Sequence, residues 1–254
     1  MKKLLFTVSL LLASVAILPT TAQSQEAMAS NQAGVYNWSG RVSAGGNIQS
    51  GNTDTKTAVA DANIKARDLN NRIGLGGEVN WAEDDGEKSA DNQKIFGTYD
   101  RFVTADQKWF VGGEQTFERD EFALLDLRSK TGAFVGHQFY ESDDRNLQVK
   151  LGPNYIYEDF STGDKDSYAA LGWALDYDQK FLESKALQFY HNHELNTPFE
   201  DAGAYIFESK TGLRVPLSKR LDASAQVDFD WDNDPITGAQ EDDTTYAVKL
   251  GYGW

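Results

Sequence analysis

Three histidines are the first candidates for chemistry in this chain, because imidazole is the commonest general acid or base in proteins. They are His137, His191 and His193. His191 and His193 lie two residues apart, so an extended strand would place both on one face, where they could hold a metal ion. A serine hydrolase would need a serine held beside a histidine by a third group. No local stretch supplies that arrangement, and we predict no catalytic residue.

The most motif-like acidic run extends from Asp228 to Pro235. Counted from Asp230, its acidic positions match positions 1, 3, 5 and 12 of an EF-hand loop. The sixth position requires glycine but holds Pro235, whose fixed φ cannot make the sharp turn, so an EF-hand is not expected. A looser calcium or magnesium site and a merely solvated loop both stay open, and we predict no other cofactor. The residues of the loose site are Asp232, Asp234, Glu241, Asp242 and Asp243.

The elements that must position these side chains are β-strands, because apolar residues occupy every second position from Trp38 onward. The alternation recurs in about twelve segments of roughly ten to fourteen residues, long enough to cross a bilayer at the usual tilt. Short turns and longer acidic loops alternate between them. The acidic loops are predicted at 83–91, 118–126, 158–166 and 232–243. The pattern predicts an all-β fold, a transmembrane antiparallel up-and-down β-barrel over residues 38–254.

The last strand predicts how this sheet closes. Apolar and aromatic side chains alternate along it and the chain ends on a tryptophan, which is typical of the final strand of an outer-membrane barrel. These residues form the predicted assembly signal: Tyr246, Val248, Leu250, Tyr252 and Trp254. The strand beginning at Trp38 can pair with it to close the barrel. The alternative is a soluble periplasmic β-sandwich binding protein with an ordinary final strand.

Aromatic residues near the predicted strand ends indicate where a membrane would begin and end. Tryptophan and tyrosine favour the interface between lipid and water, although they also favour strands in general. The predicted interfacial set is Trp38, Trp81, Trp109, Tyr157, Tyr205 and Trp231.

The N-terminus predicts export. Lys2 and Lys3 precede an apolar run and a small polar stretch, so we expect residues 1–22 to be a signal peptide and 23–37 a short polar segment. Removal of the leader takes away these two lysines and no acidic residue, which changes the formal charge from −15 to −17. Such a charge argues against a nucleic-acid partner. The chain has no cysteine, so no disulfide supports the fold.

The polar phase of the strands predicts what lines the lumen, and it carries both signs of charge. A selective pore usually shows one sign at its constriction. We therefore expect these charges to pair across a narrow barrel and close it, with a small ion path as the alternative. The predicted set is Glu78, Asp100, Glu114, Glu118, Glu208 and Asp228 with Lys65, Arg67, Lys94, Lys130, Lys150, Lys210, Arg214 and Lys249.

Two blocks of the sequence resemble a known family. The first block, residues 38–54, contains the turn Ser50, Gly51, Asn52 and Thr53, and the second contains Glu118, Arg119, Asp120 and Arg128. Together they resemble the YdiY-like salt-induced outer-membrane proteins, a domain-of-unknown-function family. The resemblance implies an outer-membrane barrel without an assigned activity and carries over no catalytic residue.

From these observations we expect a protein of the Gram-negative outer membrane with a role in envelope integrity or in passive passage of small solutes or ions. The link to salt stress comes from the resemblance alone. Outer-membrane lipid and lipopolysaccharide are the expected partners, with the barrel-assembly machinery and periplasmic chaperones during biogenesis. The competing class is a lipid or peptide hydrolase at the barrel mouth.

Overall fold

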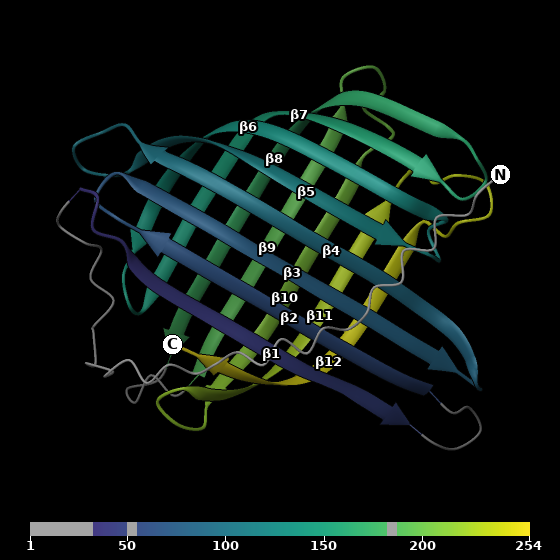
Figure 1. Cartoon of the computed structure of the whole chain (residues 1–254), viewed down its shortest axis with the longest axis horizontal. Coiled ribbons are helices and arrows are strands. Elements are labelled where there is room, and N and C mark those ends of the chain that lie inside the picture. Colours follow the sequence, from purple (N-terminus) through teal and green to yellow (C-terminus); the bar gives the residue numbers. More distant parts are fainter. Residues whose placement is uncertain (1–32, 50–54, 182–186) are drawn as a thin grey trace.

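Twelve β-strands form the regular structure of the protein in a computed structural model, which describes residues 33–49, 55–181 and 187–254. Each strand pairs antiparallel with the next, and the first pairs with the last, so the sheet closes into a barrel (Figure 1). The predicted twelve-stranded up-and-down barrel is confirmed, and the two-sheet sandwich is wrong. The strands are β1 (Asn37–Gln49), β2 (Thr55–Arg67), β3 (Asn71–Asp84), β4 (Glu87–Phe102), β5 (Trp109–Asp120), β6 (Leu125–Glu141), β7 (Arg145–Phe160), β8 (Lys165–Phe181), β9 (Leu187–Pro198), β10 (Ile206–Pro216), β11 (Leu221–Asp232) and β12 (Asp242–Gly253).

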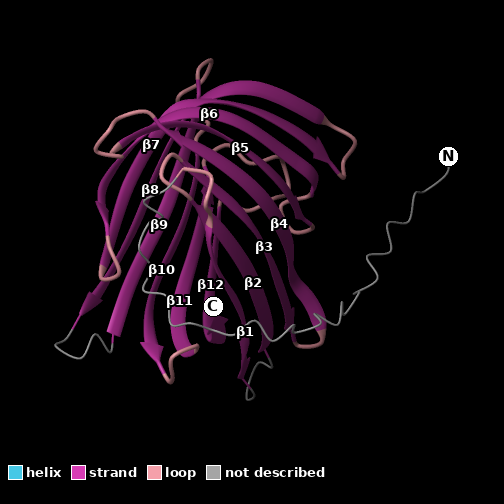
Figure 2. Cartoon of the chain, turned by 60° about the vertical axis from the view of Figure 1, so that its left-hand side comes forward, coloured by secondary structure: helices cyan, strands magenta, loops and turns pink. Residues whose placement is uncertain are grey.

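The two faces of the barrel wall differ in polarity, as the alternation in the sequence predicts. On β12, Tyr246, Val248 and Leu250 point outward and are 64–67% exposed, whereas Ala247 and Lys249 between them are buried on the lumen side. The strands wrap around one central axis (Figure 2). The described part of the chain contains no helix long and apolar enough to cross a membrane.

The connections are shorter than predicted. In place of an acidic loop at 83–91, β3 continues to Asp84 and β4 starts at Glu87, which leaves a tight turn at Asp85 and Gly86, both with positive φ. The loops expected at 118–126 and 158–166 shrink in the same way to 121–124 and 161–164. Polar residues can continue a strand where both of its faces meet water, so loss of the apolar alternation does not mark a strand end. The predicted signal peptide and the turn from Ser50 to Thr53 lie outside the described residues.

Because the strand number is even, β1 begins and β12 ends at the same end of the barrel, which we call the terminal end. Closure there depends on a close approach of two residues. Gly40 and Trp254 exchange backbone hydrogen bonds of 3.1 and 3.0 Å. A Cβ atom added to Gly40 would lie 2.3 Å from the Trp254 ring. The absence of a side chain at Gly40 thus makes room for the terminal tryptophan.

A buried carboxylate organises the turn between β2 and β3 at the terminal end. Asp68 Oδ1 accepts hydrogen bonds from the backbone N–H groups of Asn70 (2.8 Å) and Asn71 (2.5 Å), and its Oδ2 accepts one from Gly34 (2.8 Å). Burial raises the pKa of Asp68, but these hydrogen bonds and those from the Asn71 side chain outweigh it, so the pKa lies below its ordinary value. Asp68 therefore joins the segment before β1 to the barrel.

Substitution of Gly40 by alanine is expected to weaken closure by about 1–3 kcal/mol, because the added methyl group overpacks against Trp254. The measurement is the yield of the compact, heat-modifiable form in gel electrophoresis after refolding. The matched control is Gly97→Ala, also on the outward face, where the nearest atom to the new Cβ is the flexible Leu75 Cδ2 at 3.3 Å. Equal yields for the two variants would contradict this seam geometry.

Asp68→Asn is expected to destabilise the barrel at neutral pH but not in acid. Since the folded pKa of Asp68 lies below the unfolded value of about 3.9, its contribution is fully present above that value and is lost as the pH falls through the folded pKa. Urea titrations from pH 7 to pH 3 should show the difference between wild type and variant shrinking below about pH 4. The control is Asp143→Asn at an exposed turn residue, and a pH-independent difference for Asp68→Asn would refute this role.

Candidate functional site

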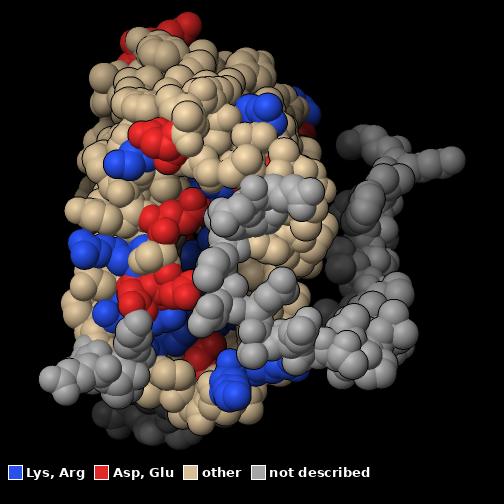
Figure 3. Space-filling view, turned by 90° about the vertical axis from the view of Figure 1, so that its left-hand side faces the viewer, with Lys and Arg blue, Asp and Glu red and all other residues tan. Residues whose placement is uncertain are grey.

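The lumen is the candidate functional site, because the charged residues of the strands gather there. Figure 3 looks onto the terminal end, where basic and acidic side chains alternate across the opening. A charged side chain that stays in water keeps its hydration. Inside the barrel it loses part of that hydration, and a partner of opposite charge must offset the lost free energy. The geometry of these partners decides whether the barrel is open or closed.

Three ion pairs connect strands that are far apart around the wall. Lys94 on β4 binds Glu208 on β10 at 2.5 Å, and these strands are diametrically opposite in the twelve-stranded barrel. Lys210 on β10 binds Glu78 on β3. Lys130 binds Glu194 on β9, with Glu114 at 3.5 Å. Single side-chain pairs therefore span the lumen, so opposite walls are in direct contact through charged groups.

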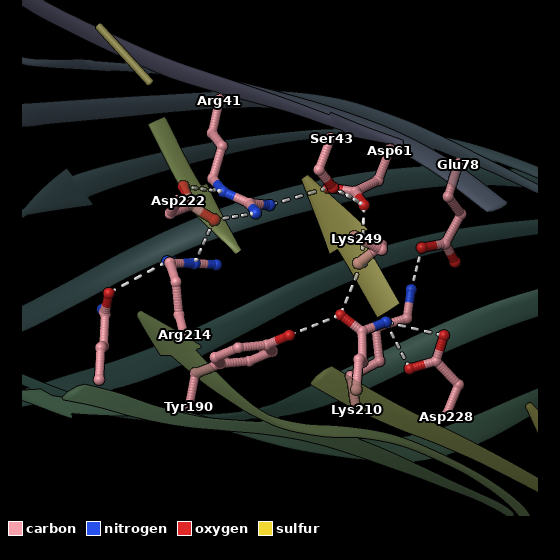
Figure 4. A network of polar contacts seen from close by, with 12 residues as sticks. Arg41, Ser43, Asp61, Glu78, Tyr190, Lys210, Arg214, Asp222, Asp228 and Lys249 are labelled. Carbon is pink, nitrogen blue, oxygen red and sulfur yellow. Dashed lines mark hydrogen bonds and ion pairs between the residues drawn. The ribbon is translucent and has the colours of Figure 1, made fainter. Parts of the chain in front are cut away.

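A second layer lies toward the terminal end (Figure 4). Lys249, only 4% exposed, donates to Asp61 and Gln226, each at 2.7 Å. Asp61 also accepts a hydrogen bond from the Ser43 hydroxyl. The layer continues through Arg41, whose guanidinium donates to Asp222 at 2.6 Å. Each charge in this layer thus has a partner on a different strand.

Aromatic rings and guanidinium groups gather in the lumen near the terminal end. Phe102, Phe110 and Phe134 form a buried hydrophobic cluster inside the lumen. The Arg67 guanidinium lies 3.8 Å from the centroid of the Phe102 ring, and that of Arg72 lies 4.9 Å from the Phe110 ring. Arg72 also donates to Asp100 at 2.6 Å. These cation–π contacts place charge and ring together, so both guanidinium groups have aromatic partners in this layer.

Around Arg128, the second family block forms the layer farthest from the terminal end. Arg128 lies 2.5 Å from Glu158 and 3.7 Å from Glu118, and it reaches Asp232 on β11 at 3.6 Å. Asp120 Oδ1 accepts the backbone N–H groups of two turn residues. Arg119 points the other way and lies 3.7 Å from Glu121. The block therefore organises the mouth of the barrel and the turn beside it.

Small cavities lie between these layers. Two cavities lie in the lumen, one between Lys94, Arg128 and Glu208 and one between Glu114, Lys150 and Glu194, and they measure about 10 and 20 Å³. Each has room for about one water molecule. The expectation that mixed charges pair across the lumen is confirmed for the described residues.

Several members of the network were not predicted from the sequence, among them Asp61, Glu194 and Asp222. The sequence does indicate that these side chains face the lumen, because each alternates with outward apolar residues on its strand. The sequence does not indicate their partners, because the pairs join strands that are distant in sequence. Lys65 and Lys150, which were predicted, do face the lumen, and Lys150 lies 4.8 Å from the Phe134 ring centroid.

The acidic residues predicted as a loose cation site are not brought together. Asp232 accepts the backbone N–H of Asp234 at 3.1 Å and turns its other oxygen to Arg128. Glu241 contributes a backbone carbonyl, which accepts the Asp232 N–H at 2.8 Å. Asp242 and Asp243 begin β12. In the described ranges, no three histidine, aspartate or glutamate side chains are grouped so that they could hold a metal ion.

All three histidines lie in the outward phase, as expected from the alternation. His137 packs edge-on against Trp109 at a ring separation of 4.6 Å. His193 packs in the same way against Trp173, and its Nδ1 lies 2.9 Å from His191 Nε2. These histidines therefore do not provide a general base inside the lumen, which a hydrolase acting there would require.

The predicted interfacial aromatics fall at the two ends of the wall. Trp38 and Trp109 start their strands at the terminal end, where Tyr252 and Trp254 also lie. The other predicted members, Trp81, Tyr157, Tyr205 and Trp231, lie near the opposite strand ends. This arrangement is what two interfacial belts on a membrane barrel require.

Comparisons with known proteins agree with this fold. A family model described as "Protein of unknown function, DUF481" matches residues 42–254. The chain is 22% identical over 220 residues to the uncharacterized protein YdiY of Escherichia coli (strain K12). The aligned region covers 84% of this chain and 82% of YdiY. The solved NanC porin is similar in fold, with a TM-score of 0.51 at 10% identity, over 84% of this chain and 98% of NanC.

Removing one partner of the buried Lys249–Asp61 pair is expected to cost about 3–5 kcal/mol, because it leaves a charge without its counterion in the lumen. The variant is Asp61→Ala, and urea titration in lipid vesicles measures the free energy of unfolding. Asp61→Ala with Lys249→Met should recover much of the loss. The control, Asp159→Ala, breaks an exposed pair with Lys165 and should cost at most about 1 kcal/mol. Equal losses for the two pairs would contradict the buried network.

Proposed function

Because the chain belongs to the family of proteins of unknown function DUF481, whose description names no activity, we propose a function from the barrel itself. The protein is an outer-membrane β-barrel with a structural role in the envelope, and its lumen is closed to solutes in the resting form. Passive passage is limited to water and the smallest ions.

The observation that carries this proposal is the direct ion pairing of opposite walls, above all Lys94 with Glu208 at 2.5 Å. A barrel of twelve strands is wider than the eight-stranded kind that side chains just fill, and narrower than the porins of sixteen or more strands that leave a water channel. Long charged side chains bridge this intermediate width. A solute would have to break several such pairs to cross.

The proposed location is the outer membrane of a Gram-negative bacterium. It is supported by the apolar outward face, the two groups of aromatic residues and the closed wall, which satisfies backbone groups without water. Outer-membrane lipid and lipopolysaccharide are the proposed surroundings. The barrel-assembly machinery and periplasmic chaperones are the proposed partners during insertion, with the terminal strand up to Trp254 as the recognised segment.

A link to salt stress is part of the proposal and follows from the nature of the closing contacts. Raising the salt concentration from 0.1 to 1 M shortens the Debye length from about 10 Å to about 3 Å. Pairs with partly exposed side chains, such as Lys210 with Glu78, are weakened most. High external salt would therefore loosen the network, whereas deeply buried pairs such as Lys249 with Asp61 would hold it together.

Hydrolysis at the barrel mouth is the alternative function, and no group of side chains in the described part of the chain favours it. The histidines lie on the outward face against aromatic rings. We therefore propose that the protein is not an enzyme. Release of fatty acid or peptide by the purified barrel would overturn this part of the proposal.

Planar-bilayer recordings test the closed lumen. The wild type should conduct far less than the NanC porin recorded in parallel, and its conductance should rise more steeply with salt than the bulk solution does. Lys94→Ala with Glu208→Ala should raise the conductance several-fold by removing the bridge between opposite walls. The control, Lys56→Ala with Glu83→Ala, removes an outward-facing pair of 3.0 Å and should change nothing. Large wild-type channels at low salt would disprove the closed lumen.

A further inference from the structure

Basic side chains on the outward face have different partners at the two ends of the barrel. Near the mouth, four outward bases each lie within 4 Å of a carboxylate. These pairs are Lys56 with Glu83 at 3.0 Å, Lys88 with Asp91 at 2.8 Å, Arg119 with Glu121 at 3.7 Å and Lys165 with Asp159 at 2.6 Å. At the terminal end, Arg101 and Arg220 are exposed and form no ion pair with a carboxylate in the described part of the chain.

A chain of hydrogen bonds fixes the position of Arg101 at the end of β4. The carboxylate of Asp68 can only accept, so both of its oxygens take the Asn71 side-chain nitrogen at 3.0 Å, which turns Asn71 Oδ1 toward β4. That oxygen accepts the Arg101 Nη1 and the Tyr99 hydroxyl, each at 2.9 Å. A guanidinium carries five N–H donors. Arg101 is therefore held in place while most of its donors are left for a further acceptor.

Arg220 is held in a similar way beside the end of β12. Its backbone carbonyl accepts the Gly253 N–H at 2.8 Å, and its Nη1 donates to the Tyr252 hydroxyl at 2.9 Å. The Tyr252 ring lies 6.4 Å from that of Trp254, measured between ring centroids. The exposed Lys219 precedes Arg220 and adds a second positive charge. A second guanidinium is thus fixed beside the aromatic residues that end the chain.

The carboxylates nearest in sequence lie on the other side of the wall. Asp100 and Asp222 both form their ion pairs inside the lumen, at 2.6 Å. Side chains alternate across a strand, so an acid next to an outward base faces inward. Arg145, also exposed at the terminal end, differs because Asp143 and Asp144 precede it in its turn. Uncompensated positive charge on the outward face is therefore concentrated at Arg101 and Arg220.

The two guanidinium groups lie at the height of lipid headgroups if the barrel spans a membrane. Tyr99 and Tyr252 face outward and are 47% and 38% exposed, and such aromatic residues occupy the interface between hydrocarbon and water. Arg101 lies two residues beyond Tyr99, which places it roughly 5 Å nearer the terminal end at the usual spacing and tilt. The longest connection, 233–241, lies at the mouth, so we expect the terminal end to face the periplasm.

We propose that Arg101 and Arg220 bind the phosphate groups of anionic phospholipids in the periplasmic leaflet. This inference rests on the proposed membrane location. A planar guanidinium matches two phosphate oxygens at once, and the tyrosine beside each arginine offers an apolar ring to the acyl chains. A negatively charged leaflet attracts these groups further. The outward bases near the mouth are already neutralised by carboxylates, so the barrel holds the periplasmic leaflet by charge and not the outer one.

Native mass spectrometry of the refolded protein tests the proposal by counting retained lipids after incubation with equal amounts of phosphatidylglycerol and phosphatidylcholine. The wild type should retain several-fold more phosphatidylglycerol. Arg101→Gln with Arg220→Gln should lower this retention several-fold, and lysine at both positions should restore part of it, because the charge returns without the planar fork. The control, Lys56→Gln with Lys165→Gln, removes the same charge near the mouth and should leave retention unchanged.

The outcomes separate this site from the membrane location. Equal retention of the two lipids by the wild type would overturn the site without any variant, and so would an equal loss in the two glutamine variants, which would indicate a long-range effect of net charge. Loss of the retained lipid in excess inorganic phosphate would replace the lipid by a free anion. Flotation of the wild type with vesicles tests the membrane location by itself, and a protein that floats but fails the lipid test overturns only the phosphate site.

Gel electrophoresis of the compact, heat-modifiable form shows whether each variant has folded. Both arginines are exposed, so we expect the variants to fold as the wild type does.

Discussion

Charge pairing across the lumen is the interaction on which the rest of the structure depends. A lysine or glutamate inside a sheet barrel loses most of its hydration, and only a close counterion and further hydrogen bonds offset that cost. Here the counterions come from other strands, as in the contact of Lys94 with Glu208 across the full barrel. The same contacts therefore satisfy the charges and connect opposite walls of the barrel through the lumen.

Much of the wall could be predicted from the sequence, because each strand carries its own period-2 pattern. That Tyr246 faces outward and Lys249 faces the lumen can be predicted from the alternation along β12 alone, without knowing which strands lie beside it. Loop lengths could not be predicted, since Glu87 and Lys88 extend β4 where both faces meet water and no apolar period remains. The pairing of Lys94 with Glu208 was equally hidden, because it depends on the closure of the whole twelve-stranded sheet and not on any local pattern.

The family block around Glu118 and Arg128 shows how one short segment can serve two purposes. Its inward residues pair with Glu158 and Asp232, which joins β5, β6, β7 and β11 at the mouth. Its Asp120 holds the backbone of the adjacent turn. Neither role requires a substrate, so the motif is explained by the architecture of the mouth. A resemblance built on such residues identifies the fold strongly and the activity weakly.

The last strand contributes to two parts of the barrel. Its residues from Val248 to Gly253 pair with β1, and Trp254 adds two backbone hydrogen bonds with Gly40. Toward the mouth, Thr245 accepts a hydrogen bond from Asn80 on β3, and the loop before β12 is held by the Asn233 side chain, which donates to the Gly203 carbonyl. One strand therefore closes the sheet at the terminal end and ties the mouth together at the other, and both tasks depend on contacts with strands that are distant in sequence.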